Sequence, residues 1–135
     1  MNSTTITATF GISSGATLSS RDVRVTSLGV QSAVNPNDTF TVQGATLTSI
    51  SPNAHTRGGV GFTVTLTGTN LTGATAVNVT RPGGAVGITV SNVTPVNATT
   101  VTATFTISGT AVQSGRNVTV TTPIGNTNAV TFTIQ

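Results

Sequence analysis

The chain carries very little charge. Only 5% of its 135 residues are Asp, Glu, Lys or Arg, and Lys and Glu do not occur at all. The sequence pI of about 11.8 therefore reflects five scattered arginines set against two aspartates, and it does not describe a basic surface. Nucleic-acid binding requires clustered cationic side chains, often with aromatic platforms for stacking. We therefore expect no nucleic-acid partner.

Cysteine is also absent, which excludes disulfides and thiolate metal sites. The two acidic residues, Asp22 and Asp38, are too few to enclose Ca²⁺, which takes about six to eight oxygen ligands. We predict no metal and no cofactor. Asp22, between Arg21 and Arg24, is interpreted as charge-balanced by them, and Asp38 as a turn residue.

The chain has a single histidine, His55, in the segment Asn-Ala-His-Thr-Arg. A catalytic triad needs a nucleophile and an acid beside the histidine, and both aspartates lie within the first 43 residues. General acid–base catalysis likewise needs a positioned titratable pair. We therefore predict that His55 is a solvated loop residue and that the protein is not an enzyme.

Long apolar runs are missing too. No stretch has the length of a transmembrane helix, and no charged-then-apolar signal peptide opens the sequence. We expect no membrane insertion. If the protein is secreted, its export signal has been removed or lies outside this sequence.

The residues that are abundant favour β structure. About a quarter of the residues are threonine and 36% are hydrophobic, which is too apolar for a disordered chain. Apolar residues and threonines alternate along much of the sequence, most clearly over residues 99–107, 62–66 and 129–135. Because successive side chains of a strand point to opposite faces, this pattern predicts antiparallel sheets packed face to face.

Turn signals divide the second part of the chain into seven segments. They predict strands near residues 45–50, 60–68, 74–80, 86–93, 99–107, 116–121 and 128–135. Seven short strands over about ninety residues match the size of an immunoglobulin-like sandwich. The predicted fold class is therefore an all-β, immunoglobulin-like β-sandwich.

The sequence also repeats itself. Residues 2–13 read NSTTITATFGIS and residues 97–108 read NATTVTATFTIS. The similarity continues through residues 23–25 and 118–120, and then through residues 40–43 and 132–135 after a shift of three residues. Such self-similarity indicates tandem modules. Residues 1–43 are therefore predicted to be the C-terminal half of a module, with about three strands, and residues 44–135 a complete module that follows without a flexible linker, as in a stiff array.

The complete module resembles the IPT/TIG domains. The resemblance rests on residues 47–53 (LTSISPN), the pair Gly58-Gly59, and residues 63–71 (TVTLTGTNL), 118–125 (VTVTTPIG) and 127–132 (TNAVTF). It implies an immunoglobulin-like fold but no single function, because related domains occur in bacterial surface proteins, carbohydrate-active enzymes, receptors and transcription factors. The members that bind DNA use basic loops, and the corresponding loops here are nearly uncharged.

The half-module is predicted to expose an apolar face. We expect an assembly surface made of Phe10, Ile12, Val23, Val25, Phe40 and Val42. A patch of this size marks an interaction site or a risk of aggregation. An upstream segment, another copy of the chain, or the chain's own complete module are the three alternatives for what covers it.

Two functional hypotheses follow. The first is a structural or adhesive module of an extracellular array or filament, with other copies or neighbouring modules as partners. The second is an accessory module of a secreted protein that binds carbohydrate. Glycan sites usually carry exposed Trp or Tyr, and neither occurs here, so glycan contact ranks second. Threonine-rich sheet faces and several Asn-x-Thr triplets are interpreted as ordinary consequences of the composition.

Overall fold

The computed structural model describes residues 4–13 and 15–135, and these residues are almost entirely β structure. The chain divides into two compact units, Met1–Val42 and Gln43–Gln135, one residue before the boundary expected from the sequence. The only described helix is the 3-10 turn η1 (Pro36–Asp38). No described helix is long and apolar enough to cross a membrane.

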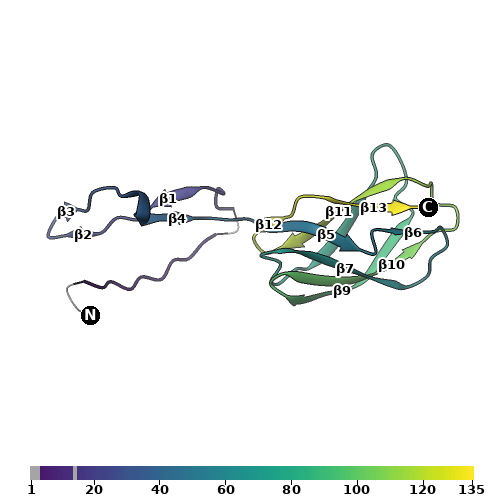
Figure 1. Cartoon of the computed structure of the whole chain (residues 1–135), viewed down its shortest axis with the longest axis horizontal. Coiled ribbons are helices and arrows are strands. Elements are labelled where there is room, and N and C mark those ends of the chain that lie inside the picture. Colours follow the sequence, from purple (N-terminus) through teal and green to yellow (C-terminus); the bar gives the residue numbers. More distant parts are fainter. Residues whose placement is uncertain (1–3, 14) are drawn as a thin grey trace. The chain divides into compact units, whose positions relative to one another are not determined.

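The larger unit contains two sheets (Figure 1). In the first sheet the order is β5 (Thr46–Ser51), β7 (Phe62–Thr69), β10 (Thr100–Ile107) and β9 (Ile88–Asn97). In the second sheet the order is β12 (Gly125–Asn126), β11 (Gly115–Thr122), β13 (Val130–Ile134) and β6 (Ala54–His55), and β8 (Ala76–Thr80) also pairs with β11. All of these pairings are antiparallel except β13 with β6.

Alternating residues from both sheets form one hydrophobic core. On β10 the apolar residues Val101, Ala103, Phe105 and Ile107 are buried, while the intervening threonines lie nearer the surface. The second sheet contributes Phe132, whose ring meets that of Phe105 edge-on with the ring centroids 5.4 Å apart. This is the two-layer arrangement that the alternation predicts, so the predicted all-β sandwich is confirmed.

The seven strands predicted for residues 44–135 correspond to β5, β7, β8, β9, β10, β11 and β13. The largest difference is at β9, which continues through Thr94 and Pro95 to Asn97 although this dipeptide suggested a turn. Proline is tolerated there because β9 is an edge strand and its ladder with β10 shifts register at this point. The short strands β6 and β12 were not predicted.

The smaller unit is built from two short antiparallel ladders. One pairs β1 (Ser20–Asp22) with β4 (Thr39–Thr41), and the other pairs β2 (Thr26–Ser27) with β3 (Val30–Gln31). The sequence repeat implied a strand near residues 5–12, but these residues form none. Their counterpart β10 is hydrogen-bonded to β7 and β9, and the described part of the smaller unit has no equivalent of either strand.

Candidate assembly surface

The smaller unit repeats, in the same register, the pairing of β11 with β13 and of β11 with β12 in the larger unit. Adding 95 to a residue number between 4 and 32, or 92 to one between 38 and 42, gives its counterpart in the larger unit. The β1–β4 ladder then has the register of the β11–β13 ladder: the pairs Ser20–Thr41, Arg21–Phe40 and Asp22–Thr39 correspond to Gly115–Thr133, Arg116–Phe132 and Asn117–Thr131. The sequence repeat is therefore also a structural repeat.

The loops repeat as well. The β2–β3 hairpin has the same register as β11–β12. The amide of Val25 donates to the hydroxyl of Ser32 at 3.2 Å, as the amide of Val120 donates to the hydroxyl of Thr127 at 3.0 Å. The amide of Val42 donates to the carbonyl of Ser19 at 3.0 Å, as Ile134 does to Ser114 at 3.1 Å. The amides of Val25 and Val42 therefore have partners equivalent to those of Val120 and Ile134, which lie in the core of the larger unit.

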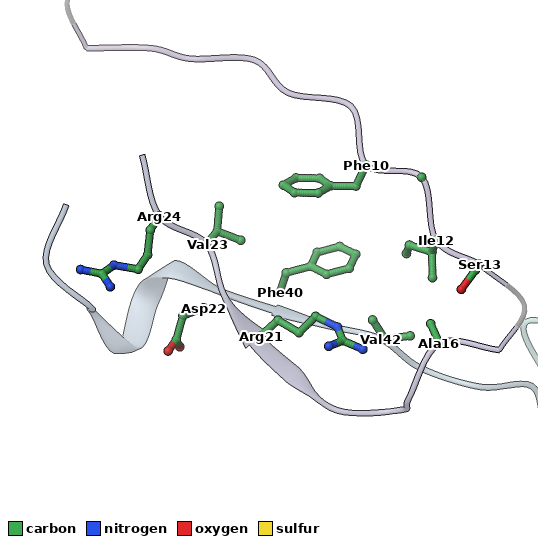
Figure 2. A pocket seen from close by; sticks show the side chains of 11 residues that line it. Phe10, Ile12, Ser13, Ala16, Arg21, Asp22, Val23, Arg24, Phe40 and Val42 are labelled. Atoms are coloured by element: carbon green, nitrogen blue, oxygen red, sulfur yellow. The ribbon is translucent and has the colours of Figure 1, made fainter. Parts of the chain in front are cut away.

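The predicted assembly surface lies around two neighbouring pockets. The first is an open pocket of about 470 Å³, and its lining brings together five of the six predicted residues: Phe10, Ile12, Val23, Phe40 and Val42. Figure 2 shows the ring of Phe10 above that of Phe40, and the two are stacked with centroids 5.4 Å apart. The sixth residue, Val25, lines the second pocket together with Val23 and Phe40.

The side chains of the assembly surface are more exposed than their counterparts in the larger unit. Phe10 is 56% exposed, Ile12 50% and Val25 43%, whereas their counterparts Phe105, Ile107 and Val120 are at most 2% exposed. Val23 and Phe40 are half-buried. Val42 is already buried, so it contributes less open area than we expected. The apolar face is thus partly open, and it is widest around Phe10 and Ile12.

Sequence reasoning missed the most unusual polar residue of the fold. Arg116 is fully buried, and its guanidinium donates to four backbone carbonyls and one hydroxyl. The acceptors are the carbonyls of Val86 (2.6 Å), Ser114 (2.9 Å), Gly115 (3.2 Å) and Val112 (2.8 Å), and the hydroxyl of Ser114 (2.6 Å). Burial, with a smaller contribution from the charge of Arg81, lowers the pKa of Arg116.

A signal for Arg116 was present in the sequence. Arg116 alternates with Val118 and Val120, so it occupies a position that faces the core. The same alternation places Arg21 with Val23 and Val25 in the smaller unit. Arg21 Nη2 donates to the carbonyl of Thr17 at 3.1 Å, the counterpart of the bond from Arg116 to Val112, although Arg21 itself is exposed.

Two other residues singled out from the sequence are placed as follows. His55 is not a solvated loop residue: it belongs to β6, is half-buried, and stacks on Phe62 with ring centroids 4.2 Å apart. The prediction missed the parallel pairing of β6 with β13, which brings the histidine beside the core. Asp38 ends the η1 turn, as predicted.

We expected Arg21 and Arg24 to balance the charge of Asp22, but both guanidinium groups donate to backbone carbonyls instead. Arg21 donates to Thr17, and Arg24 donates through Nε and Nη2 to the carbonyl of Ser32, at 2.9 and 2.6 Å. Both arginines therefore stabilise loops of the smaller unit. Within residues 4–13 and 15–135, no group of three or more His, Cys, Asp or Glu residues is placed to hold a metal ion.

Comparison with known proteins adds no further information on this surface. No protein-family model matches the chain, and a search of curated proteins finds no relative similar in sequence.

Proposed function

We propose that the protein is a non-catalytic structural or adhesive module of an extracellular array or filament, in which the smaller unit is completed by another segment or subunit. The observation that carries this proposal is the open apolar face on a unit that repeats the β11–β13 and β11–β12 pairings of a module in the same register. Apolar patches of this kind on soluble proteins mark interaction sites.

The strand order supports an immunoglobulin-like module, and the sequence resemblance points within that fold to the IPT/TIG type. A sheet ordered β5-β7-β10-β9 faces a sheet in which β8, β11 and β13 are neighbours. Immunoglobulin constant-type domains have this order, with four strands ABED in one sheet and three strands CFG in the other. The fold itself is compatible with many functions, so the structural role rests on the open face and not on the fold.

The extracellular location is also part of the proposal. The scarcity of charge, the absence of lysine and the direct succession of two related units suit a repetitive surface protein. The chain contains neither Trp nor Tyr, so the open face has no indole or phenol ring on which a sugar could stack. A binding partner of polypeptide chemistry therefore fits the face better than a glycan.

The experiment is light scattering after size exclusion over a range of concentrations, with negative-stain images of the largest species. We expect masses above that of the monomer, rising with concentration, and regular fibres. A variant with Phe10→Ser and Ile12→Ser should return the chain to a monomer. The control is Val60→Ser, because Val60 is 83% exposed but lies on the larger unit. A chain that is monomeric at every concentration, or association unaffected by the double substitution, would contradict the proposal.

A further inference from the structure

The repeat between the two units is incomplete in a specific way. Residues 4–42 correspond to residues 99–134, which hold β10, β11, β12 and β13. The smaller unit has no counterpart of residues 46–97, which hold β5, β6, β7, β8 and β9. In the larger unit, residues 46–97 cover the apolar face that corresponds to the open face of the smaller unit.

We propose that the assembly surface binds a β-segment with the strand pattern of residues 46–97, supplied by a further module of the same repeat type. This inference rests on the proposed function and specifies the partner. The donated segment supplies alternating apolar residues to the pockets around Phe40, and it pairs with residues 5–12.

Residues 5–12 have the sequence of a strand that lacks its neighbours. In the larger unit β10 pairs with β7 in the register Val101–Leu66, Ala103–Val64 and Phe105–Phe62. The corresponding residues here are Ile6, Ala8 and Phe10, and the side chains of Ile6 and Phe10 are 65% and 56% exposed. A donated strand with the pattern of β7 would satisfy the backbone of residues 5–12 and cover both side chains, as strand addition does in general.

The second sheet requires a strand as well. Val118 and Val120 of β11 pair with Val79 and Val77 of β8. The counterparts of Val118 and Val120 are Val23 and Val25. The described part of the smaller unit has no strand corresponding to β8 beside them, and Val25 is 43% exposed. The donated segment therefore has to contribute to both layers, which a single added strand cannot do.

Arg21 adds a specific requirement to the binding of the donated segment, which is a backbone carbonyl at the position that Val86 has beside Arg116. Four of the five acceptors of Arg116 lie within residues 112–115, and the fifth is the carbonyl of Val86, bound by Nε at 2.6 Å. Val86 belongs to the segment that has no counterpart in the smaller unit. The donated segment would supply the matching carbonyl to Nε of Arg21, and this contact would bury the arginine as Arg116 is buried.

An intact second copy does not fit as the donor. In the larger unit Val64, Leu66 and Val77 are at most 6% exposed, because they already cover its own β10, β11 and β13. Donating them would open that core. The partner is therefore an additional segment of this type, and intact copies associate through their open apolar faces only while that segment is missing.

The experiment adds a second copy of residues 44–98 ahead of the full chain and follows amide hydrogen exchange and light scattering. We expect exchange of residues 5–12 to slow by about tenfold or more, as for strands within a cooperative unit, and the association of the unmodified chain to disappear. The control fusion carries Val64→Asp and Leu66→Asp in the added copy only, and it should protect nothing. Slow exchange of β7 and β10 in the original larger unit verifies that each fusion is folded.

Arg21 provides an independent measurement. Arg21→Lys should destabilise the smaller unit more in the fused protein than in the unmodified chain, whereas Arg24→Lys should have the same effect in both, because the bonds from Arg24 to Ser32 lie within its own unit. An effect of Arg21→Lys that does not increase on fusion would overturn the role of Arg21.

The outcomes separate this inference from the proposed function. Folded fusions without protection of residues 5–12, or with equal protection in the control, would overturn the donated segment and leave the association of the original chain intact. Protection of residues 5–12 in the unmodified chain, rising with concentration, would identify a second copy as the occupant and would also overturn it.

Discussion

A buried arginine without an acidic partner is the clearest residue-scale feature of this protein. The guanidinium of Arg116 has no solvent exposure, and its donors are directed at carbonyls close to the start of β11. A buried cation is stable only when its donors are satisfied, since removing it from water is costly. Arg116 therefore also fixes the conformation of residues 112–115, because these residues supply most of its acceptors.

We expect Arg116→Lys to destabilise the larger unit by about 2–4 kcal/mol. Lysine keeps the charge but cannot reach the same set of carbonyls, because its three donors sit on one nitrogen. Urea unfolding followed by far-ultraviolet circular dichroism would measure this change, since the chain has no Trp for fluorescence. The control is Arg57→Lys, because the Arg57 residue is exposed and its replacement should change stability by less than about 0.5 kcal/mol. Equal effects of the two changes would contradict the role assigned to Arg116.

The two counterpart phenylalanines should differ in the same assay. Phe105→Ala removes a fully buried ring and should cost about 3–5 kcal/mol in the free energy of unfolding. Phe10→Ala removes a ring that is 56% exposed, and it should change the unfolding of the larger unit by less than about 0.5 kcal/mol. Comparable losses would mean that Phe10 is buried in solution.

Single residues were predictable from the sequence where alternation alone decides their place. The core positions of β7, β10, β11 and β13 follow from period-two patterning. His55 was placed wrongly because the strand β13, with which β6 pairs, is distant in sequence. No local pattern carries that information.

At the scale of strands, close approach at Gly68 links β5 to β7. A Cβ at Gly68 would lie within bonding distance of the carbonyl of Thr46, at the point where the β5–β7 register shifts. Glycine is found in strands where backbones approach this closely. We expect Gly68→Ala to cost about 2–3 kcal/mol in unfolding free energy, because the neighbouring group is backbone and has to shift.

The matched control for this change is Gly109→Ala. Nothing lies within 4 Å of a Cβ at Gly109, so the substitution should be neutral within about 0.5 kcal/mol. Thermal unfolding of both variants gives the comparison. A neutral Gly68→Ala would mean that the bulge adjusts without cost.

Asn128, between β12 and β13, is hydrogen-bonded to β5 of the other sheet. Its side-chain amide donates to the carbonyl of Leu47 and accepts from the amide of Leu47, both at 2.9 Å, so it acts as an extra backbone partner for β5. We expect Asn128→Ala to destabilise the larger unit by about 1–3 kcal/mol, because both backbone groups lose their partner. The control is Asn117→Ala at an exposed position of β11. Circular dichroism melts would contradict the assignment if the two variants lost the same stability.

Strand positions and most strand ends were predictable, but the end of β9 was not. The turn residues bounded six of the seven strands well, but β9 runs past its expected end because a ladder with β10 overrides the local signal of Thr94-Pro95. The strand expected near residues 5–12 failed for the opposite reason. Its sequence favours a strand, but the described residues of the smaller unit offer no strand that pairs with it.

At the scale of the whole molecule, the two units should differ in cooperativity. The larger unit has a continuous core of fully buried residues, whereas many large apolar residues of the smaller unit remain exposed. We expect amides of β7, β10 and β11 to exchange slowest, and amides of β1 and β4 to exchange faster by at least about a hundredfold. Hydrogen exchange of the unmodified chain at low concentration tests this. Equal protection in both units would mean that the smaller unit is completed.

The contacts of Arg116 also bear on how the stability of the larger unit depends on pH and salt. Its partners are carbonyls and a hydroxyl, which take up no protons in moderate acid, so no carboxylate has to stay ionised to hold it. With only seven formally charged residues in the chain, there are few ion pairs for salt to screen. The larger unit should therefore keep its stability from acidic to neutral pH and from dilute buffer to brine.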